Sequence, residues 1–169
     1  MLILARVVSN LLKTALFTIA FPGTVAVYVP YRLRATGPQA ISALGWLGLA
    51  PLAIGIAVYL WCAWDFATFG RGTPLPLDAP RQLVARGLYR YVRNPMYWGV
   101  LLVIDGQALL FASLPTLCYG LAVAAGFHLF VILYEEPALT RQFGESYRQY
   151  LKTVPRWIPK PAAARAPAK

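Results

Sequence analysis

The sequence has little charge, few acids and almost no residues of the kinds that form metal sites or disulfides. Charged residues make up 13% of its 169 positions, with six acids against 16 lysines and arginines. About 25% is usual in soluble domains, so this composition excludes an ordinary soluble domain. Cys62 and Cys118 both lie in apolar segments and, with a single histidine, give neither a disulfide framework nor a metal-ligand spacing. We therefore expect buried thiols and no metal.

The chain is instead rich in apolar residues, which make up 59% of it. Long apolar runs of this kind predict an all-α fold, an integral-membrane helical bundle. A net charge of +10 would suggest nucleic acid in a soluble protein. Here the basic residues flank the apolar runs, so we expect a membrane and no nucleic acid. The four expected spans cover about 11–29, 41–69, 97–111 and 116–134.

Small residues and prolines predict how these spans are shaped. The first run is long enough to cross a membrane and has no clean cleavage site after it, so we expect a retained helix, kinked at Pro22-Gly23. Gly45, Gly48 and Gly55 permit close helix packing. The turn Ser113-Leu114-Pro115 predicts that the last two spans form an antiparallel hairpin.

The chain after Pro137 has a different pattern. Phe143, Tyr147, Tyr150 and Val154 recur at helical spacing, with charged residues opposite. We expect an amphipathic helix over about 138–153, lying in the membrane interface. Residues 159–169 look disordered, which leaves one domain over 1–158.

The distribution of basic residues predicts the orientation. Four spans place both termini on one side, together with the 70–96 connection and its five arginines and the tail with its seven basic residues. By the positive-inside rule this side is cytoplasmic, although Arg32 and Arg34 of the first loop oppose it.

The stretch 87–98, which opens the third span, is the strongest candidate for a binding site. Asn94 is expected to be the N-cap and Pro95 the first helical residue, so free N–H groups and a positive dipole end follow Arg90 and Arg93. These groups suit an anionic, partly aromatic ligand at the membrane surface. The alternative is a basic loop that only anchors a span. The aromatic neighbours are Tyr89, Tyr91, Tyr97 and Trp98.

Acids and the histidine within the spans leave alternatives open. Asp65 is either interfacial or functional, and the nearby tryptophans, which mark the same level, favour the interfacial position. Asp105 shares a face with Trp98 and is either functional or hydrogen-bonded to another helix. His128 and Glu135, seven residues apart, form either a ligand-facing stripe or ordinary interhelical contacts.

The neighbouring pair Glu135-Glu136 leaves a further alternative open. These acids either cap a tail helix that begins at Pro137 or bind a cationic group.

Two motifs resemble a known family. Gly-Leu-Tyr-Arg-Tyr-Val-Arg-Asn-Pro-Met-Tyr at 87–97 resembles the Arg-His-Pro-x-Tyr signature of the isoprenylcysteine carboxyl methyltransferase and phospholipid methyltransferase families. The segment 134–150 is similar to their second motif, a Glu pair followed by Phe-Gly and Tyr-x-x-Tyr. The resemblance covers about 87–158.

The resemblance implies an integral-membrane enzyme that uses S-adenosylmethionine without a Rossmann domain, in a pocket built from the last two spans and the tail. Its methyl acceptor would be lipophilic or small: an isoprenylcysteine carboxylate, a phospholipid amine or a thiol. Arg93 suits the carboxylate of the methyl donor, a glutamate its ammonium, and aromatic faces its adenine and sulfonium. The implied cofactor residues are Tyr89, Arg93, Asn94, Pro95, Tyr97, Trp98, His128, Glu135, Glu136, Tyr147 and Tyr150.

One position departs from the family pattern. Asn94 stands where these families usually have histidine, and an amide cannot titrate. If the family's histidine acts as a base, that role is absent here or passes to His128 or Glu135. The candidate catalytic residues are therefore Asn94, His128 and Glu135.

Two other functions fit part of the pattern. A sterol-type, NADPH-dependent membrane reductase has a similar architecture and a related Arg-x-Pro-x-Tyr element. A non-catalytic lipid-binding or scaffold protein would account for the membrane spans alone, and it would tolerate loss of Arg93 and Glu135.

Overall fold

The computed structural model describes residues 12, 15–34, 41–70 and 83–159. Within these ranges every regular element is helical and no strand occurs, which confirms the all-α class. The start of the first expected span, part of the 70–96 connection and the tail beyond residue 159 lie outside the described ranges. The α-helices are α2 (Val29–Leu33), α3 (Leu49–Asp65), α4 (Pro95–Leu110), α5 (Leu114–Phe130), α6 (Glu136–Phe143) and α7 (Glu145–Thr153).

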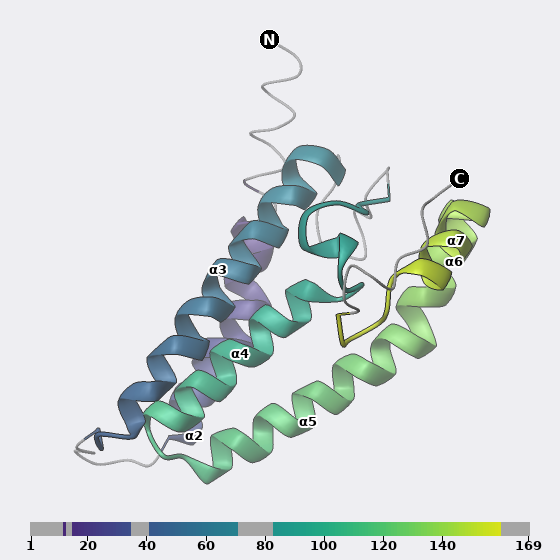
Figure 1. Ribbon diagram of the computed structural model, residues 1–169. Helices are drawn as coiled ribbons and strands as arrows, with labels where there is room; N and C mark the ends of the chain where they lie inside the picture. The colour runs from purple at the N-terminus through teal and green to yellow at the C-terminus, as the bar shows by residue number, and fades with distance from the viewer. Residues whose placement is uncertain (1–11, 13–14, 35–40, 71–82, 160–169) are drawn as a thin grey trace.

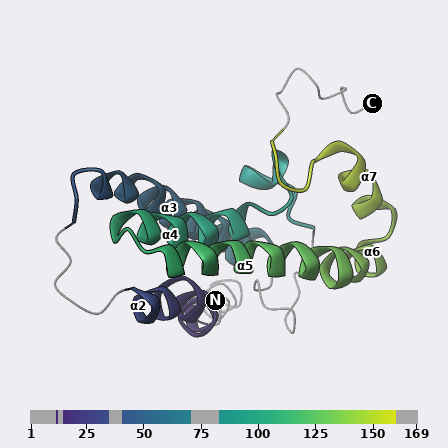
Figure 2. The same ribbon diagram turned by 90° about the horizontal axis from the view of Figure 1, so that it is seen from below.

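The helices α3, α4 and α5 run in alternate directions (Figure 1) and lie side by side (Figure 2). The turn after α4 is short, and the Oγ of Ser113 caps α5 by accepting from the Thr116 N–H. This confirms the expected hairpin. Because the directions alternate, residues 83–94 lie at the same end of the bundle as α6 and α7.

Glycines set the distance between α3 and α4. A Cβ added to Gly55 would lie 2.7 Å from the Gly99 carbonyl oxygen, and one added to Gly99 would lie 2.9 Å from the Gly55 carbonyl oxygen. Gly48 and Gly106 oppose each other in the same way. The backbones therefore touch, as expected from the small residues of the second span.

The helices differ in length, and this difference recesses one end of α4. Three helical stretches are long and apolar enough to cross a membrane: Ala15–Leu33, Gly45–Phe69 and Leu114–Phe143, of 19, 25 and 30 residues. The third expected span is α4, with only 16 residues, or about 24 Å at 1.5 Å per residue. Figure 1 shows α3 extending well beyond the start of α4. The start of α4 is therefore recessed relative to the end of α3.

The first helix is irregular near the expected kink. The helix is interrupted at Phe21, the residue before Pro22, and Thr24–Tyr28 is π-helical. The Tyr119 hydroxyl of α5 donates to the Val25 carbonyl at 2.9 Å, which ties this segment to the bundle.

The fourth span is longer than the predicted range of 116–134. The helix continues from α5 through a π-helical turn, Val131–Glu135, into α6, and Pro137 does not break it. In the π-helical turn the Glu136 N–H bonds the Val131 carbonyl, five residues back. Because Pro137 has no N–H to donate, this shifted hydrogen-bond pattern allows the helix to continue through it.

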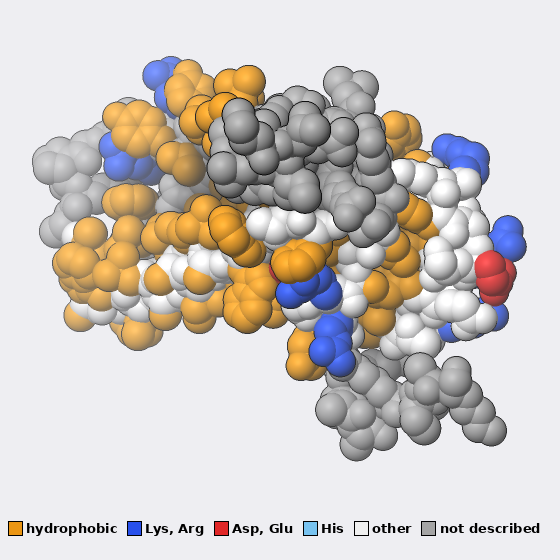
Figure 3. Space-filling view, turned by 90° about the horizontal axis from the view of Figure 1, so that it is seen from above, with side chains coloured by type: hydrophobic (Ala, Val, Ile, Leu, Met, Phe, Trp, Pro, Cys, Tyr) orange, Lys and Arg blue, Asp and Glu red, His pale blue; other side chains and the backbone are white. Residues whose placement is uncertain are grey.

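The prediction of a single amphipathic helix over 138–153 is also wrong. Gly144 adopts φ +57° and separates α6 from α7. The apolar face of α7 does not lie in lipid, because Tyr147, Tyr150 and Val154 are buried together, with Leu83 packed against them. Figure 3 shows Lys and Arg side chains around this end of the surface and hydrophobic side chains over the long helices.

Asp65 is buried, whereas the neighbouring Trp61 and Trp64 are exposed. Its residue exposure is 3%, and its Oδ1 lies 3.6 Å from Arg86 Nε. The loop that contains Gly87 folds back over the end of α3 and covers the carboxylate; Gly87 has φ +54°, and a side chain there would strike Asp65. The acid therefore helps to hold the loop that leads to α4.

Candidate functional site

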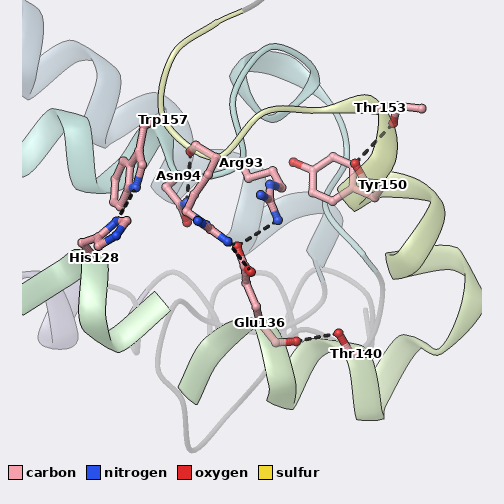
Figure 4. Close-up of polar contacts among 9 residues, drawn as sticks. Arg93, Asn94, His128, Glu136, Thr140, Tyr150, Thr153 and Trp157 are labelled. Atoms are coloured by element: carbon pink, nitrogen blue, oxygen red, sulfur yellow. Dashed lines mark hydrogen bonds and ion pairs between the residues drawn. The ribbon is translucent and has the colours of Figure 1, made fainter. Parts of the chain in front are cut away.

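A carboxylate between two arginines forms the centre of the candidate site (Figure 4). Arg156 binds Glu136 with both arms of its guanidinium, Nε to Oε1 at 2.7 Å and Nη2 to Oε2 at 2.9 Å. Arg93 Nη1 lies 2.8 Å from the same Oε1. The hydrogen bond to Glu136 raises the pKa of Arg156 above its usual value. Three segments that are distant in sequence therefore meet at one charge cluster: the start of α4, the start of α6 and the chain after α7.

Arg93 has unused hydrogen-bonding capacity. Its side chain is 10% exposed and its Nη1 is held in the ion pair with Glu136, while its Nε is buried without a hydrogen-bond partner among the described residues. Buried donors without acceptors are costly, about 1–3 kcal/mol each, and such groups commonly mark a missing ligand or water. With Arg93 and Arg156 against Glu136, the cluster carries one excess positive charge. It is suited to an additional anionic group.

Residues 154–158, which we name the C-terminal strap, cross the start of α4. The Arg93 N–H donates to the Pro155 carbonyl at 2.9 Å, and Asn94 Nδ2 donates to the Arg156 carbonyl at 3.1 Å. Trp98 Nε1 donates to the Trp157 carbonyl at 2.9 Å. Three consecutive carbonyls of the strap are thus held by the stretch Arg93–Trp98.

Asn94 occupies the expected N-cap position, but its side chain makes no capping bond. Its amide N–H donates to the strap instead, and the residue is 6% exposed. Pro95 is the first residue of α4, as predicted.

Aromatic side chains fill the space where α4 and α5 diverge. The Tyr97 and Phe127 rings lie 4.5 Å apart between centroids, and the Trp157 ring lies 6.3 Å from Tyr97. The Tyr97 hydroxyl donates to Glu135 Oε2 at 2.8 Å. Trp157 Nε1 donates to His128 Nδ1 at 3.0 Å. His128 and Glu135 therefore both reach the strap side of α5, next to the charge cluster.

Two tyrosines of α7 close the opposite side of the cluster. Burial, reinforced by the negative charge of Glu136, raises the pKa of Tyr147 to about 12. Burial also raises the pKa of Tyr150, whose hydroxyl donates to the Tyr89 carbonyl at 2.6 Å. Both phenols therefore stay protonated near neutral pH, and that of Tyr150 serves as a hydrogen-bond donor.

Most of the residues predicted for the site do meet there. The side chains of Arg93, Glu136 and Tyr147 lie in the charge cluster, and those of Tyr97, His128 and Glu135 lie in the adjoining aromatic group. Tyr89 is an exception, because its ring packs in the core with Cys62 and Val84 and only its carbonyl faces α7. Trp98 contributes by holding the strap.

Asp105 lies apart from this group. A Cβ added to Gly120 of α5 would lie 2.9 Å from Asp105 Oδ1, so the acid faces the α4–α5 contact. The sequence analysis also missed two residues, Arg156 and Trp157. Their only signal was a basic residue and a tryptophan directly after the amphipathic segment. No group of His, Cys, Asp and Glu suited to a metal ion occurs among the residues that the structure describes.

Comparison with known proteins identifies related chains. The model of the phospholipid methyltransferase family matches residues 44–146. A curated protein-S-isoprenylcysteine O-methyltransferase of Schizosaccharomyces pombe is 42% identical over 78 residues, which are 46% of this chain and 33% of the relative. The match thus spans about a third of that relative's length. No solved structure matches. The strap, residues 154–158, lies beyond the residues that the family model matches.

Proposed function

Because the chain belongs to the phospholipid methyltransferase family, we propose that it is an integral-membrane enzyme that transfers a methyl group from S-adenosylmethionine to a lipophilic or small acceptor. The observation that carries this proposal is the meeting of Arg93, Glu136 and the Tyr97–Glu135 pair at the recessed start of α4.

The unpartnered Nε–H of Arg93 fits the carboxylate of the methyl donor. A guanidinium donates charge-assisted hydrogen bonds to a carboxylate, and the Nε of Arg93 is buried without an acceptor among the described residues. The excess positive charge of the cluster favours the same group. Tyr147 lies beside Arg93 with its hydroxyl protonated and would add a neutral donor.

The glutamates fit the ammonium and the sulfonium. Glu135 is bound only by the Tyr97 hydroxyl among the hydrogen bonds seen here, which leaves acceptor capacity for a cation. Glu136 is occupied by two arginines, so we assign the ammonium to Glu135 first. The faces of Tyr97 and Trp157 suit adenine stacking and cation–π attraction.

The acceptor reaches the site from the lipid side. Above the α4–α5 contact the helices diverge, and a Cβ added to Gly126 would meet nothing within 4 Å. An apolar chain in the membrane could lie along this face of α5 with its polar end near His128. The named substrate class of the curated relative, a prenylated cysteine, is one acceptor of this shape. We place this end of the bundle on the cytoplasmic side because most basic residues flank it.

S-adenosylmethionine, when bound, supplies an activated methyl group on its sulfonium. The chain's own residues bind and orient the donor and keep water away from the methyl group. Arg93 and Glu135 fix the two ends of the amino-acid moiety, and the strap covers the aromatic group.

A methyl-transfer assay tests the proposal. Purified protein in lipid nanodiscs is incubated with donor labelled in its methyl group and with total lipid, prenylcysteine and thiol acceptors. We expect label in a lipophilic product, lost in Arg93→Ala and Glu135→Ala. Binding of NADPH without methyl transfer would favour the reductase instead, and normal lipid binding without either activity would favour the scaffold.

A further inference from the structure

Trp157 makes the contact that determines the chemistry of the chain's single histidine. Its indole N–H donates to His128 Nδ1 at 3.0 Å, with the two ring centroids 6.1 Å apart. The Trp157 backbone is itself fixed by the bond from Trp98 Nε1 to its carbonyl. The indole of the strap therefore lies against His128 of α5, as Figure 4 shows.

This contact selects one tautomer of the imidazole. A nitrogen that accepts a hydrogen bond cannot carry a proton, so neutral His128 holds its proton on Nε2. No other hydrogen bond of His128 is seen among the described residues, and its side chain is exposed. Nε2–H is thus the free polar group of the ring, and it is a donor rather than an acceptor.

The other candidate bases of the site are already engaged. Glu136 is bound by Arg93 and Arg156, Glu135 is assigned above to the ammonium of the methyl donor, and Asn94 cannot titrate. An amine acceptor is an ammonium near neutral pH and must lose a proton before it can attack carbon. A carboxylate or a thiolate needs no such step.

Resting on the methyltransferase function proposed above, we propose that Trp157 is a positioning residue that keeps His128 as a hydrogen-bond donor, and that this arrangement selects a lipophilic acceptor that is already anionic. In the transfer, an oxygen or sulfur of the acceptor forms a bond to the methyl carbon. The bond from that carbon to the donor sulfur breaks, and its electron pair stays on sulfur. No proton is released, so no base is needed; His128 Nε2–H holds the anion in place.

The tautomer can be observed directly because the chain has one histidine. The protein is labelled with ¹⁵N-histidine, purified with a histidine-free tag and studied by NMR in nanodiscs. We expect an unprotonated Nδ1 and a protonated Nε2 in the wild type, and a mixture of tautomers in Trp157→Phe, which keeps the ring and loses the N–H. Trp98→Phe is the matched control: it loosens the same strap without touching His128, and the tautomer should stay fixed. A wild-type Nδ1 that carries the proton, or an unchanged spectrum in Trp157→Phe, would overturn the proposal.

Acceptor choice is the functional test. Three acceptors that share one isoprenoid chain and end in a carboxylate, a thiol or an amine compete for labelled donor. We expect the carboxylate, the acceptor that is anionic near neutral pH, to be methylated at least about tenfold faster than the amine, the factor one charge-assisted hydrogen bond supplies. Trp157→Phe should shrink that ratio severalfold, whereas Trp98→Phe should lower all rates and leave the ratio alone.

The outcomes separate this inference from the function on which it rests. Equal or faster methylation of the amine overturns the acceptor choice and leaves the methyltransferase intact. Absence of transfer to all three acceptors overturns both. A ratio that changes equally in the two tryptophan variants shows that Trp157 only supports the strap, and this also contradicts the inference.

Discussion

The two faces of α4 pack against their neighbours in different ways. Toward α3, glycines bring backbone against backbone, and any added carbon would strike a carbonyl or an amide. Toward α5, the helices separate, and the space holds side chains: Tyr97, Phe127 and, from the strap, Trp157. The first face has no room for a ligand and cannot adjust. The second is filled by side chains rather than backbone, at the end where the charge cluster lies.

This contrast separates scaffold from site. The α3–α4 pair fixes the position of the recessed α4 start, so that Arg93 and Asn94 are presented at a constant depth. The strap and α5 then complete the site by contacts that are individually modest. Substitutions should therefore affect stability on one face and ligand binding on the other.

The largest effect is expected at Glu136. In Glu136→Ala, Arg93 and Arg156 lose their shared partner, and removing one member of a buried charge cluster costs about 3 kcal/mol. Hydrogen exchange of α7 and the strap should rise strongly. Glu145→Ala is the control, because Glu145 is exposed and lies 3.4 Å from Arg148; its loss should cost less than about 1 kcal/mol. Similar exchange in both variants would contradict the central role of Glu136.

Gly99→Ala tests the scaffold face. Its new Cβ would lie 2.9 Å from the Gly55 carbonyl oxygen and from the Tyr59 nitrogen, and such overpacking costs about 2 kcal/mol. Thermal unfolding in detergent measures it. Gly126→Ala is the matched change on α5, where the new Cβ meets nothing, and it should be neutral or stabilise by up to about 1 kcal/mol. Equal melting temperatures would remove the contrast between the two faces.

Arg93→Lys tests the ligand face. A lysine keeps the charge and loses the planar pair of donors, so we expect the dissociation constant for S-adenosylhomocysteine to rise about tenfold, or about 1.4 kcal/mol. The melting temperature should change little. Unchanged affinity would mean that only the charge is used.

The smallest effect is expected at Asn94. Asn94→Ala removes the bond to the Arg156 carbonyl and should loosen the strap by about 1 kcal/mol. Asn94→His retains a donor and should keep activity within about threefold of the wild type. Complete loss of activity in Asn94→His would show that the position does more than orient the strap and cofactor.

Sequence patterns predicted the parts of the molecule that depend on local rules. Apolar runs, the Asn94-Pro95 boundary and the close packing at the glycines of the second expected span follow from backbone chemistry, and the structure agrees. The spacing of Tyr147 and Tyr150 predicted a helix face but not what would cover it. A helical stripe looks the same whether lipid or protein lies against it.

The strap escaped prediction for a different reason. Its contacts run through the carbonyls of Pro155, Arg156 and Trp157, which every residue possesses, to partners about sixty positions away. No spacing encodes such contacts. In the same way, the charges of Arg93 and Glu136 were visible in the sequence, but their pairing with each other was not, because pairing depends on how deeply the start of α4 is recessed.

The most direct test of the account is calorimetric titration of S-adenosylhomocysteine into the protein in nanodiscs, with NADPH titrated in parallel and with Glu135→Gln as the paired variant. We predict saturable binding of S-adenosylhomocysteine alone, weakened about tenfold in Glu135→Gln, whose neutral amide cannot pair with an ammonium. Binding of NADPH, or equal affinity of the wild type and Glu135→Gln for S-adenosylhomocysteine, would contradict the claim that the methyl donor docks between Arg93 and Glu135.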